Sequence, residues 1–327
     1  MASRSTWSTI IAVVLLALTA RPADAQENAA AWPKQPIKLV IGFAAGGGND
    51  LIARIVGAKL GERVGQPVVV ENKPGAGANI AAEAVARAAP DGYTLLVVPP
   101  ATCCINPAVY SKLPYDPIGS FEYVTIIAHF PILLAVATDS PHRSVAELVA
   151  WAKANPARAN YASTSAFFQL LTELFKLKTG APLEHIPYKG SNEMMTAVLN
   201  GQATAAFVDA SALMGQVKAG KARVLATAGT RRYGELPDVP TLVEAGVTGV
   251  AVDGWSGLAA PKGTPAAIVH RLADEIAAIV KLPDVEERFR ALGVAGGGGT
   301  PEPIGKRVER EKAIWTEVAK AAGVKLE

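Results

Sequence analysis

The chain is poor in cysteine and in aromatic residues. Its 327 residues include two cysteines, adjacent at 103 and 104, which excludes a disulfide scaffold and any zinc or iron–sulfur site built from several cysteines. Aromatic side chains make up 6% of the residues, although 50% are hydrophobic. With 30 glycines and 23 prolines, this composition indicates an Ala/Val/Leu-rich α/β protein with many tight strand-to-helix turns.

Neither sign of charge dominates. Lys and Arg total 32 against 29 Asp and Glu. The basic residues are scattered, and their densest groups are adjacent pairs such as Arg231–Arg232. A nucleic-acid partner is therefore not expected. A nearly balanced charge with this much hydrophobic content also argues against disorder.

Catalytic motifs are missing as well. No glycine-rich segment has the spacing of a phosphate-binding loop or a dinucleotide fingerprint, and Gly254-Trp255-Ser256-Gly257 falls one residue short of a nucleophile elbow. The four histidines lie far apart, at 129, 142, 185 and 270. The sequence therefore predicts neither an enzyme nor a cofactor or metal site.

Apolar runs long enough to span a membrane are absent, and the longest unbroken run is at the N-terminus. Ile10–Leu18 is unbroken but far too short to cross about 30 Å of hydrocarbon. It is followed by Ala23-Asp24-Ala25, a small-x-small site. We interpret 1–25 as a signal peptide cleaved after Ala25, which predicts export to the periplasm; a buried N-terminal helix is the alternative. In an oxidising compartment Cys103 and Cys104 could form a strained disulfide, but buried free thiols are favoured.

Short apolar strands alternate with helical segments along the chain. Strands at 37–43, 68–70 and 93–98 enclose Gly-rich turns and helices, which is typical of doubly wound α/β structure. Two extended segments, 124–138 and 250–258, predict two crossings between lobes. We therefore expect lobe 1 to comprise 26–130 and 253–327 and lobe 2 to comprise 131–252, with a ligand cleft between them.

The sequence also predicts several local features. Ser144 is expected to cap a helix at 145–154, and Asn49 or Asp50 the helix after the first Gly-rich turn. The last helices, 265–281, 284–292 and 301–321, are expected to be joined by a flexible Gly296–Gly299 linker.

Two strand-to-helix turns stand out, at 44–50 and 75–79. Both are rich in small residues, and the backbone N–H groups at a helix N-terminus bind anions well. The alternative is that these glycines only make tight turns.

Several further motifs follow one another along the chain. The first runs from Pro36-Ile37-Lys38 to Gly46-Gly47-Gly48-Asn49-Asp50, and the others are the segments 69–80, 90–96, 105–107, 113–117, 186–190, 236–241 and 255–265. Together they resemble the Bordetella-uptake-gene (Bug) type solute-binding proteins of tripartite tricarboxylate transporters. They cover nearly the whole chain after the signal segment, in the order found in the family.

This resemblance implies a type II periplasmic-binding-protein fold that closes on a small organic acid anion, a di- or tricarboxylate or an aromatic carboxylate. It implies a monomer that delivers this ligand to membrane permease subunits. It also implies that two Gly-rich loops of lobe 1 and the Ser/Thr loop and acidic position of lobe 2 bind the ligand. The positions that match are Phe43, Ala45, Gly46, Gly47, Asp50, Ala76, Gly77, Asn79, Ser163, Thr164, Ser165 and Asp209.

The sequence departs from the family pattern after Ser165. The segment Ala166-Phe167-Phe168-Gln169 replaces a longer glycine-rich, His-containing stretch. Phe167 and Phe168 could line the pocket or pack in the core, and packing is favoured for at least one. Asp209 could equally be a helix N-cap. Two other functions stay open: a ligand-loaded sensor subunit that signals to a membrane histidine kinase, and a secreted hydrolase.

Overall fold

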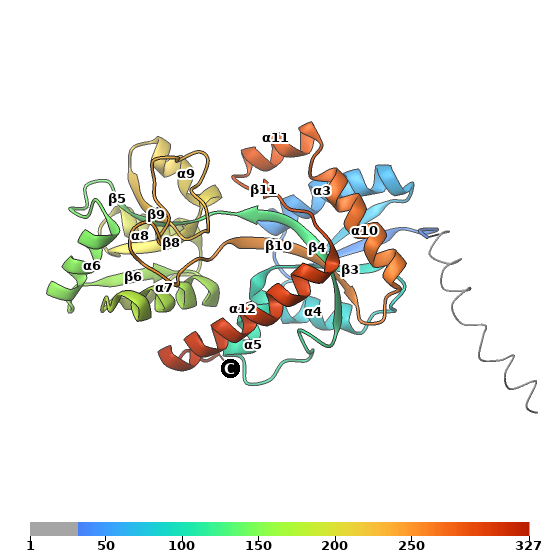
Figure 1. Cartoon of the computed structure of the whole chain (residues 1–327), viewed down its shortest axis with the longest axis horizontal. Helices are drawn as coiled ribbons and strands as arrows, with labels where there is room; N and C mark the ends of the chain where they lie inside the picture. The colour runs from blue at the N-terminus through green and yellow to red at the C-terminus, as the bar shows by residue number, and fades with distance from the viewer. Residues whose placement is uncertain (1–31, 327) are drawn as a thin grey trace, which may run out of the picture.

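The computed structural model describes residues 32–326, so the predicted signal peptide, 1–25, lies outside the described residues. Two mixed sheets, each with helices on both faces, lie side by side along the long axis (Figure 1). The expected architecture of two doubly wound α/β lobes is confirmed. Among the described residues, no helix is both long enough and apolar enough to cross a membrane.

The first sheet has six strands in the order β11-β4-β10-β3-β1-β2. Their bounds are β1 (Ile37–Ile41), β2 (Val68–Asn72), β3 (Thr94–Val98), β4 (Phe121–Phe130), β10 (Gly254–Pro261) and β11 (Ala295–Gly296). On one face pack α3 (Gly48–Val64), α10 (Ala266–Ile279) and α11 (Pro283–Ala291). On the other face lie η1 (Ala76–Ala78), α4 (Asn79–Ala86), the π-helical turn η2 (Ala101–Ile105), α5 (Asn106–Val109) and α12 (Pro301–Ala322).

The second sheet has five strands in the order β7-β6-β8-β5-β9. They are β5 (Ile132–Ala137), β6 (Asn160–Ser163), β7 (Glu184–Pro187), β8 (Ala205–Asp209) and β9 (Ala222–Thr227). The core on one face includes residues of α6 (Val145–Ala154) and α7 (Ala166–Thr179). On the other face pack α8 (Ser191–Leu199) and α9 (Ala210–Lys218).

Two crossings join the sheets, as the sequence predicts. β4 runs into β5 with only Pro131 between them, because proline lacks the N–H that a continuous ladder needs. In the second crossing, the Val252 N–H donates to the Ala228 carbonyl at 2.6 Å before β10 begins. β10 then pairs antiparallel with both β3 and β4.

This pairing decides where the strands end. Val98, the last residue of β3, pairs with Gly257 near the start of β10, and Asp209, the last residue of β8, pairs with Ile132 at the start of β5. β1 and β2 run parallel to β3, and β6 runs parallel to β8. The carboxyl ends of these strands therefore lie on the sides of the two sheets next to the crossings, which is where α/β sheets bind ligands.

Helix α12, red in Figure 1, links the two lobes. It packs against β4 and η2 of the first lobe and against α7 of the second. Trp315 of α12 is 2% exposed, and its ring lies 6.0 Å from that of Phe167. One hydrophobic cluster therefore extends through both lobes.

Some local predictions are confirmed and others are wrong. Ser144 caps α6, since its hydroxyl accepts the Glu147 N–H at 3.2 Å. Helix α3, however, begins at Gly48 with Gly47 as its N-cap, so neither Asn49 nor Asp50 caps it. The thiols of Cys103 and Cys104 are buried and free, with 3.4 Å between the sulfurs, which confirms the expectation of free thiols over a disulfide.

The segment Gly296–Gly299 was expected to be a flexible linker, and this is wrong. Gly296 belongs to β11, and the N–H groups of Gly297 and Gly298 donate to the Ile127 and Ile126 carbonyls of β4. A Cβ on Gly297 would lie 2.4 Å from the Ile126 carbonyl oxygen. Glycine is needed here because the backbone lies against a strand edge.

Replacing Phe175 by alanine should destabilise the protein strongly. Its side chain is fully buried, and its ring lies 5.8 Å from that of Phe207. Creating this cavity should reduce the free energy of unfolding by about 3–5 kcal/mol, measured by urea titration. Leu177→Ala on the same helix is the control: that side chain is 53% exposed, so a change within about 0.5 kcal/mol is expected. Equal effects of the two substitutions would contradict the assigned core.

Candidate ligand-binding site

Asp50 organises the first Gly-rich loop. Its side chain is 2% exposed, although it belongs to the first turn of α3. Oδ2 accepts hydrogen bonds from the Gly46 N–H and from Arg54 Nε, both at 2.9 Å, and Oδ1 accepts one from Asn72 Nδ2 at 2.9 Å. Asn72 Nδ2 also lies 3.1 Å from the Phe43 carbonyl oxygen. Asp50 and Asn72, the last residue of β2, therefore hold the loop together at Phe43 and at Gly46.

The same contacts set the protonation of Asp50. The hydrogen bond from Arg54, together with those from Gly46 and Asn72, outweighs desolvation and lowers the pKa of the Asp50 carboxyl to about 2. Asp50 is therefore ionised at neutral pH. Since both of its oxygens are already bonded within the protein, it shapes the loop.

The loop itself is open to solvent. Residues 44–48 are exposed, and Gly46 has φ +81, a conformation that favours glycine. Gly47 has φ −76, so its conformation does not require glycine. The N–H groups of the first turn of α3 have no acceptor within the helix. In the same turn, Asn49 Oδ1 is buried without a hydrogen-bond partner.

The second Gly-rich loop, 75–78, has left-handed backbone at several positions. Gly77 has φ +61, and even Ala76 and Ala78 have positive φ, at 47 and 76. Asn79, at the start of α4, is 5% exposed and supports the loop from the protein interior. Its Oδ1 accepts a hydrogen bond from Asn106 Nδ2 at 2.7 Å, and Asn106 Nδ2 also lies 2.8 Å from the Gly77 carbonyl oxygen.

Tyr115 supports the same loop. Its hydroxyl lies 2.8 Å from Asn79 Oδ1 and 2.8 Å from the Thr102 carbonyl oxygen. Burial raises the pKa of Tyr115 far above its ordinary value, so the hydroxyl keeps its proton and remains a donor.

The second Gly-rich loop packs against the end of β1. A Cβ on Gly42 would lie 2.2 Å from the Ala78 Cβ, so the end of β1 and the second loop are in direct contact. The second loop therefore lies against the residue that precedes Phe43, where the first loop begins.

The predicted residues of the second lobe follow β6. Ser163, its last residue, is 2% exposed, Thr164 is half-buried, and Ser165 is exposed at the N-cap of α7. Ser163 Oγ lies 2.8 Å from Nε2 of His185 on β7. No hydrogen bond among residues 32–326 joins this loop to the Gly-rich loops.

Asp209 lies at the end of β8 and at the N-cap position of α9, but its side chain makes no capping hydrogen bond. Part of its surface is exposed, yet desolvation by the surrounding protein raises the pKa of its carboxyl to about 6. No described cation pairs with it. Asp209 is therefore a carboxylate that lacks a stabilising partner inside the protein.

Phe167 and Phe168 both pack. Phe168 is 8% exposed in the shared core, and Phe167 lies edge-on to Trp315 at 6.0 Å. The structure thus favours packing over pocket lining for both rings.

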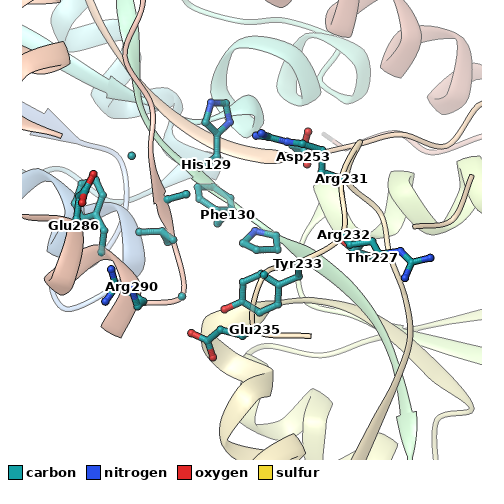
Figure 2. A pocket seen from close by; sticks show the side chains of 17 residues that line it. His129, Phe130, Thr227, Arg231, Arg232, Tyr233, Glu235, Asp253, Glu286 and Arg290 are labelled. Atoms are coloured by element: carbon teal, nitrogen blue, oxygen red, sulfur yellow. The ribbon is translucent and has the colours of Figure 1, made fainter. Parts of the chain in front are cut away.

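A cavity of about 710 Å³ lies elsewhere between the lobes (Figure 2). Its walls come from β4, the loop after β9, α11 and β11, and include His129, Phe130, Tyr233 and Arg290. None of the predicted ligand-binding residues lines it. Arg232 points away from it and is paired with Glu244 at 3.0 Å (Figure 2).

The family of the chain follows from comparison with known proteins. The model of the tripartite tricarboxylate transporter family receptor matches residues 52–319, most of the chain. The chain belongs to this receptor family. The resemblance seen in the sequence motifs is therefore confirmed.

Individual relatives agree with this assignment. The receptor is 39% identical over 278 residues to a Cupriavidus necator protein, "UPF0065 protein in gbd 5'region", covering 84% of this chain and 83% of that one. It is 32% identical over 320 residues to protein BugT of Bordetella pertussis, covering 97% and 98%.

Solved structures show the same fold. The structure of R. palustris Rpa4515 with adipate is 36% identical, with a TM-score of 0.79 over 90% of this chain and 99% of that one. MatC from Rhodopseudomonas palustris with bound malate is 29% identical, with a TM-score of 0.75 over 88% and 99%.

Three residues that hold the loops, Asn72, Asn106 and Tyr115, are not among the predicted site residues. They do lie in segments that carry the family resemblance, 69–80, 105–107 and 113–117, and this was the available signal. No local pattern indicates that His185 meets Ser163, because the two residues are 22 positions apart.

Acid should remove the stabilisation that Asp50 provides. Its lowered pKa means that this contribution is present above the unfolded-state pKa of about 4 and is lost as the pH falls through about 2. Asp50→Asn should therefore lower the melting temperature at pH 6, with the difference from wild type shrinking towards pH 2. Asp274→Asn, which changes an exposed carboxylate, is the control. A difference that is independent of pH would contradict the role of the charge.

Asp209 should act with the opposite sign. Its raised pKa means that the ligand-free protein loses stability as the pH rises from about 4 to about 6, where the native carboxyl ionises without a partner. Asp209→Asn should remove this loss, so the variant should melt at a higher temperature than wild type at pH 7 and at a similar temperature at pH 4. Melting curves across this range test it, and parallel curves for the two proteins would refute it.

Proposed function

We propose that this receptor binds a small organic acid anion between its lobes and delivers it to the permease subunits of a tripartite tricarboxylate transporter. The observation that carries the proposal is a pair of Gly-rich loops held in place by Asp50 and Asn79, the second of which packs against Gly42, just before the first. They lie at strand ends next to the crossings and present backbone N–H groups. We propose the lobes to be 26–130 with 253–327, and 131–252.

The chemistry of these loops suits a carboxylate. A hydrogen bond to a charged group contributes roughly 1.5–3 kcal/mol, so a few backbone donors can support micromolar affinity after the costs of association. The small residues at 44–48 let the ligand approach the backbone. Asp50 does not oppose the ligand from nearby, because its charge is balanced by Arg54.

The second lobe would close the site with Ser163, Thr164, Ser165 and Asp209. The Ser and Thr side chains supply hydroxyl donors for a second carboxylate. An unpaired Asp209 and the free acceptor Asn49 Oδ1 favour a ligand, or a bridging water, that also offers a donor. Structures of relatives with adipate and with malate support a small dicarboxylate.

The receptor would act in the periplasm as a monomer, without catalysis. Its family is one of transporter receptors. Ser163 and His185 touch like a nucleophile and a base, but no described carboxylate bonds to His185 to orient it as in a catalytic triad.

Titration calorimetry against a panel of mono-, di- and tricarboxylates, including adipate, malate and aromatic acids, tests the ligand class. We expect at least one acid to bind with micromolar affinity and to raise the melting temperature. If no acid on the panel binds, the proposed function is wrong.

Gly47→Val tests the location of the site. The substitution fits the backbone, since φ is −76 and the only near neighbour of a Cβ is the Ala44 carbonyl oxygen at 3.4 Å. It would place methyl groups over the N-terminus of α3, so affinity should fall by at least about tenfold with little change in melting temperature. Tyr233→Phe, in the cavity of Figure 2, is the control and should bind as wild type does. The reverse pattern would place the ligand in that cavity.

A further inference from the structure

His185 contacts the loop of the second lobe from the neighbouring strand. β6 and β7 are parallel, with Tyr161 opposite His185, so Ser163 follows on the same face of the sheet. Nε2 of His185 lies 2.8 Å from Ser163 Oγ, and this is the hydrogen bond that fixes the Ser163 hydroxyl.

The imidazole ring is itself held in place. It stacks on the Tyr161 ring with 5.0 Å between centroids and an interplanar angle of 27°. The Tyr161 hydroxyl donates to Glu173 Oε1 at 2.7 Å, and Lys176 Nζ donates to the same oxygen at 2.8 Å. Lys176 Nζ also lies 5.6 Å from the centre of the Tyr161 ring. The network extends from the middle of α7 to Ser163, so the ring has little freedom to turn.

The surroundings of His185 favour its neutral form. Burial lowers the pKa of His185, and Lys176 lowers it further while Glu173 opposes this. A neutral imidazole has one N–H donor and one acceptor nitrogen, so the tautomer decides which of the two groups donates in the Ser163 contact.

The two tautomers have different consequences for a bound anion. If Nε2 accepts, the single Ser163 proton is used inside the protein and only oxygen lone pairs remain for a ligand. If Nε2 carries the proton, it donates to Ser163 Oγ and the serine proton is free. Only the second arrangement is attractive to a carboxylate.

We propose that His185 is a positioning residue for ligand binding: its Nε2–H donates to Ser163 Oγ and turns the Ser163 hydroxyl into a donor for the ligand carboxylate. This inference rests on the proposed function. In this proposal, His185 and Ser163 together make the second lobe prefer an anion, and only Ser163 contacts the ligand.

Three substitutions separate positioning from packing. His185→Phe keeps a ring to stack on Tyr161 but loses both nitrogens, whereas His185→Gln keeps an N–H donor. Ser163→Ala removes the hydroxyl through which His185 would act. Each variant and the double variant Ser163→Ala/His185→Phe is titrated with adipate and with malate, and its melting temperature is measured without ligand.

We expect His185→Phe to weaken binding by about tenfold and His185→Gln to recover part of the loss. In the Ser163→Ala background, His185→Phe should cause no further loss, because the two residues act as one unit. A change in melting temperature alone would not produce this coupling.

The outcomes separate this inference from the proposed function. Suppose that the wild-type protein binds an acid. If His185→Phe binds it equally well, or if this substitution lowers the affinity as much in the Ser163→Ala background as in the wild-type background, the positioning role is wrong and the receptor function stands. If the wild-type protein binds neither adipate, malate nor any other acid of the panel, both are wrong.

Discussion

The antiparallel pairing between β4 and β10 is the constraint on which the structure depends. Because β4 continues into β5 and the chain returns through β10, the two strands tie two otherwise separate sheets together. β10 also pairs with β3, which aligns the parallel strands of the first sheet so that they end next to the crossing. β5 does the same for β8 in the second sheet. All the loops assigned to ligand binding therefore follow strands that end at the junction of the lobes.

The site proposed at this junction would use backbone donors more than charged side chains. Its net charge is only +3, and the candidate carboxylate site contains no unpaired arginine or lysine among the residues we assign to it. The small residues at 44–48 leave room beside the N–H groups of the first turn of α3, and the buried polar side chains Asp50 and Asn79 hold the conformations of the two loops. A nearly neutral protein can be an anion receptor in this way, since net charge does not count oriented N–H dipoles.

Contacts between the lobes limit how this site can change shape. Helix α12 is anchored on β4 and reaches α7, where Trp315 meets Phe167 at the start of the helix that follows Ser163–Ser165. A ligand that accepts hydrogen bonds from both lobes stabilises the closed position of the lobes, in which donors of both lobes reach it. The stabilisation equals the difference between the free energies of ligand binding to the closed and the open positions. Packing at the start of α7 is thus physically linked to the second half of the site.

Local signals in the sequence determined much of this protein. The Ser144 cap and the alternation of apolar strands and Gly-rich turns were predictable, because each depends on residues a few positions apart. Only the tertiary structure decided the rest. Gly296–Gly299 lies against β4, Asp50 bonds to Asn72 instead of capping its helix, and Ser163 meets His185. Each of these pairs is distant in the chain, and its geometry is set by strand register and helix packing, which no local pattern encodes.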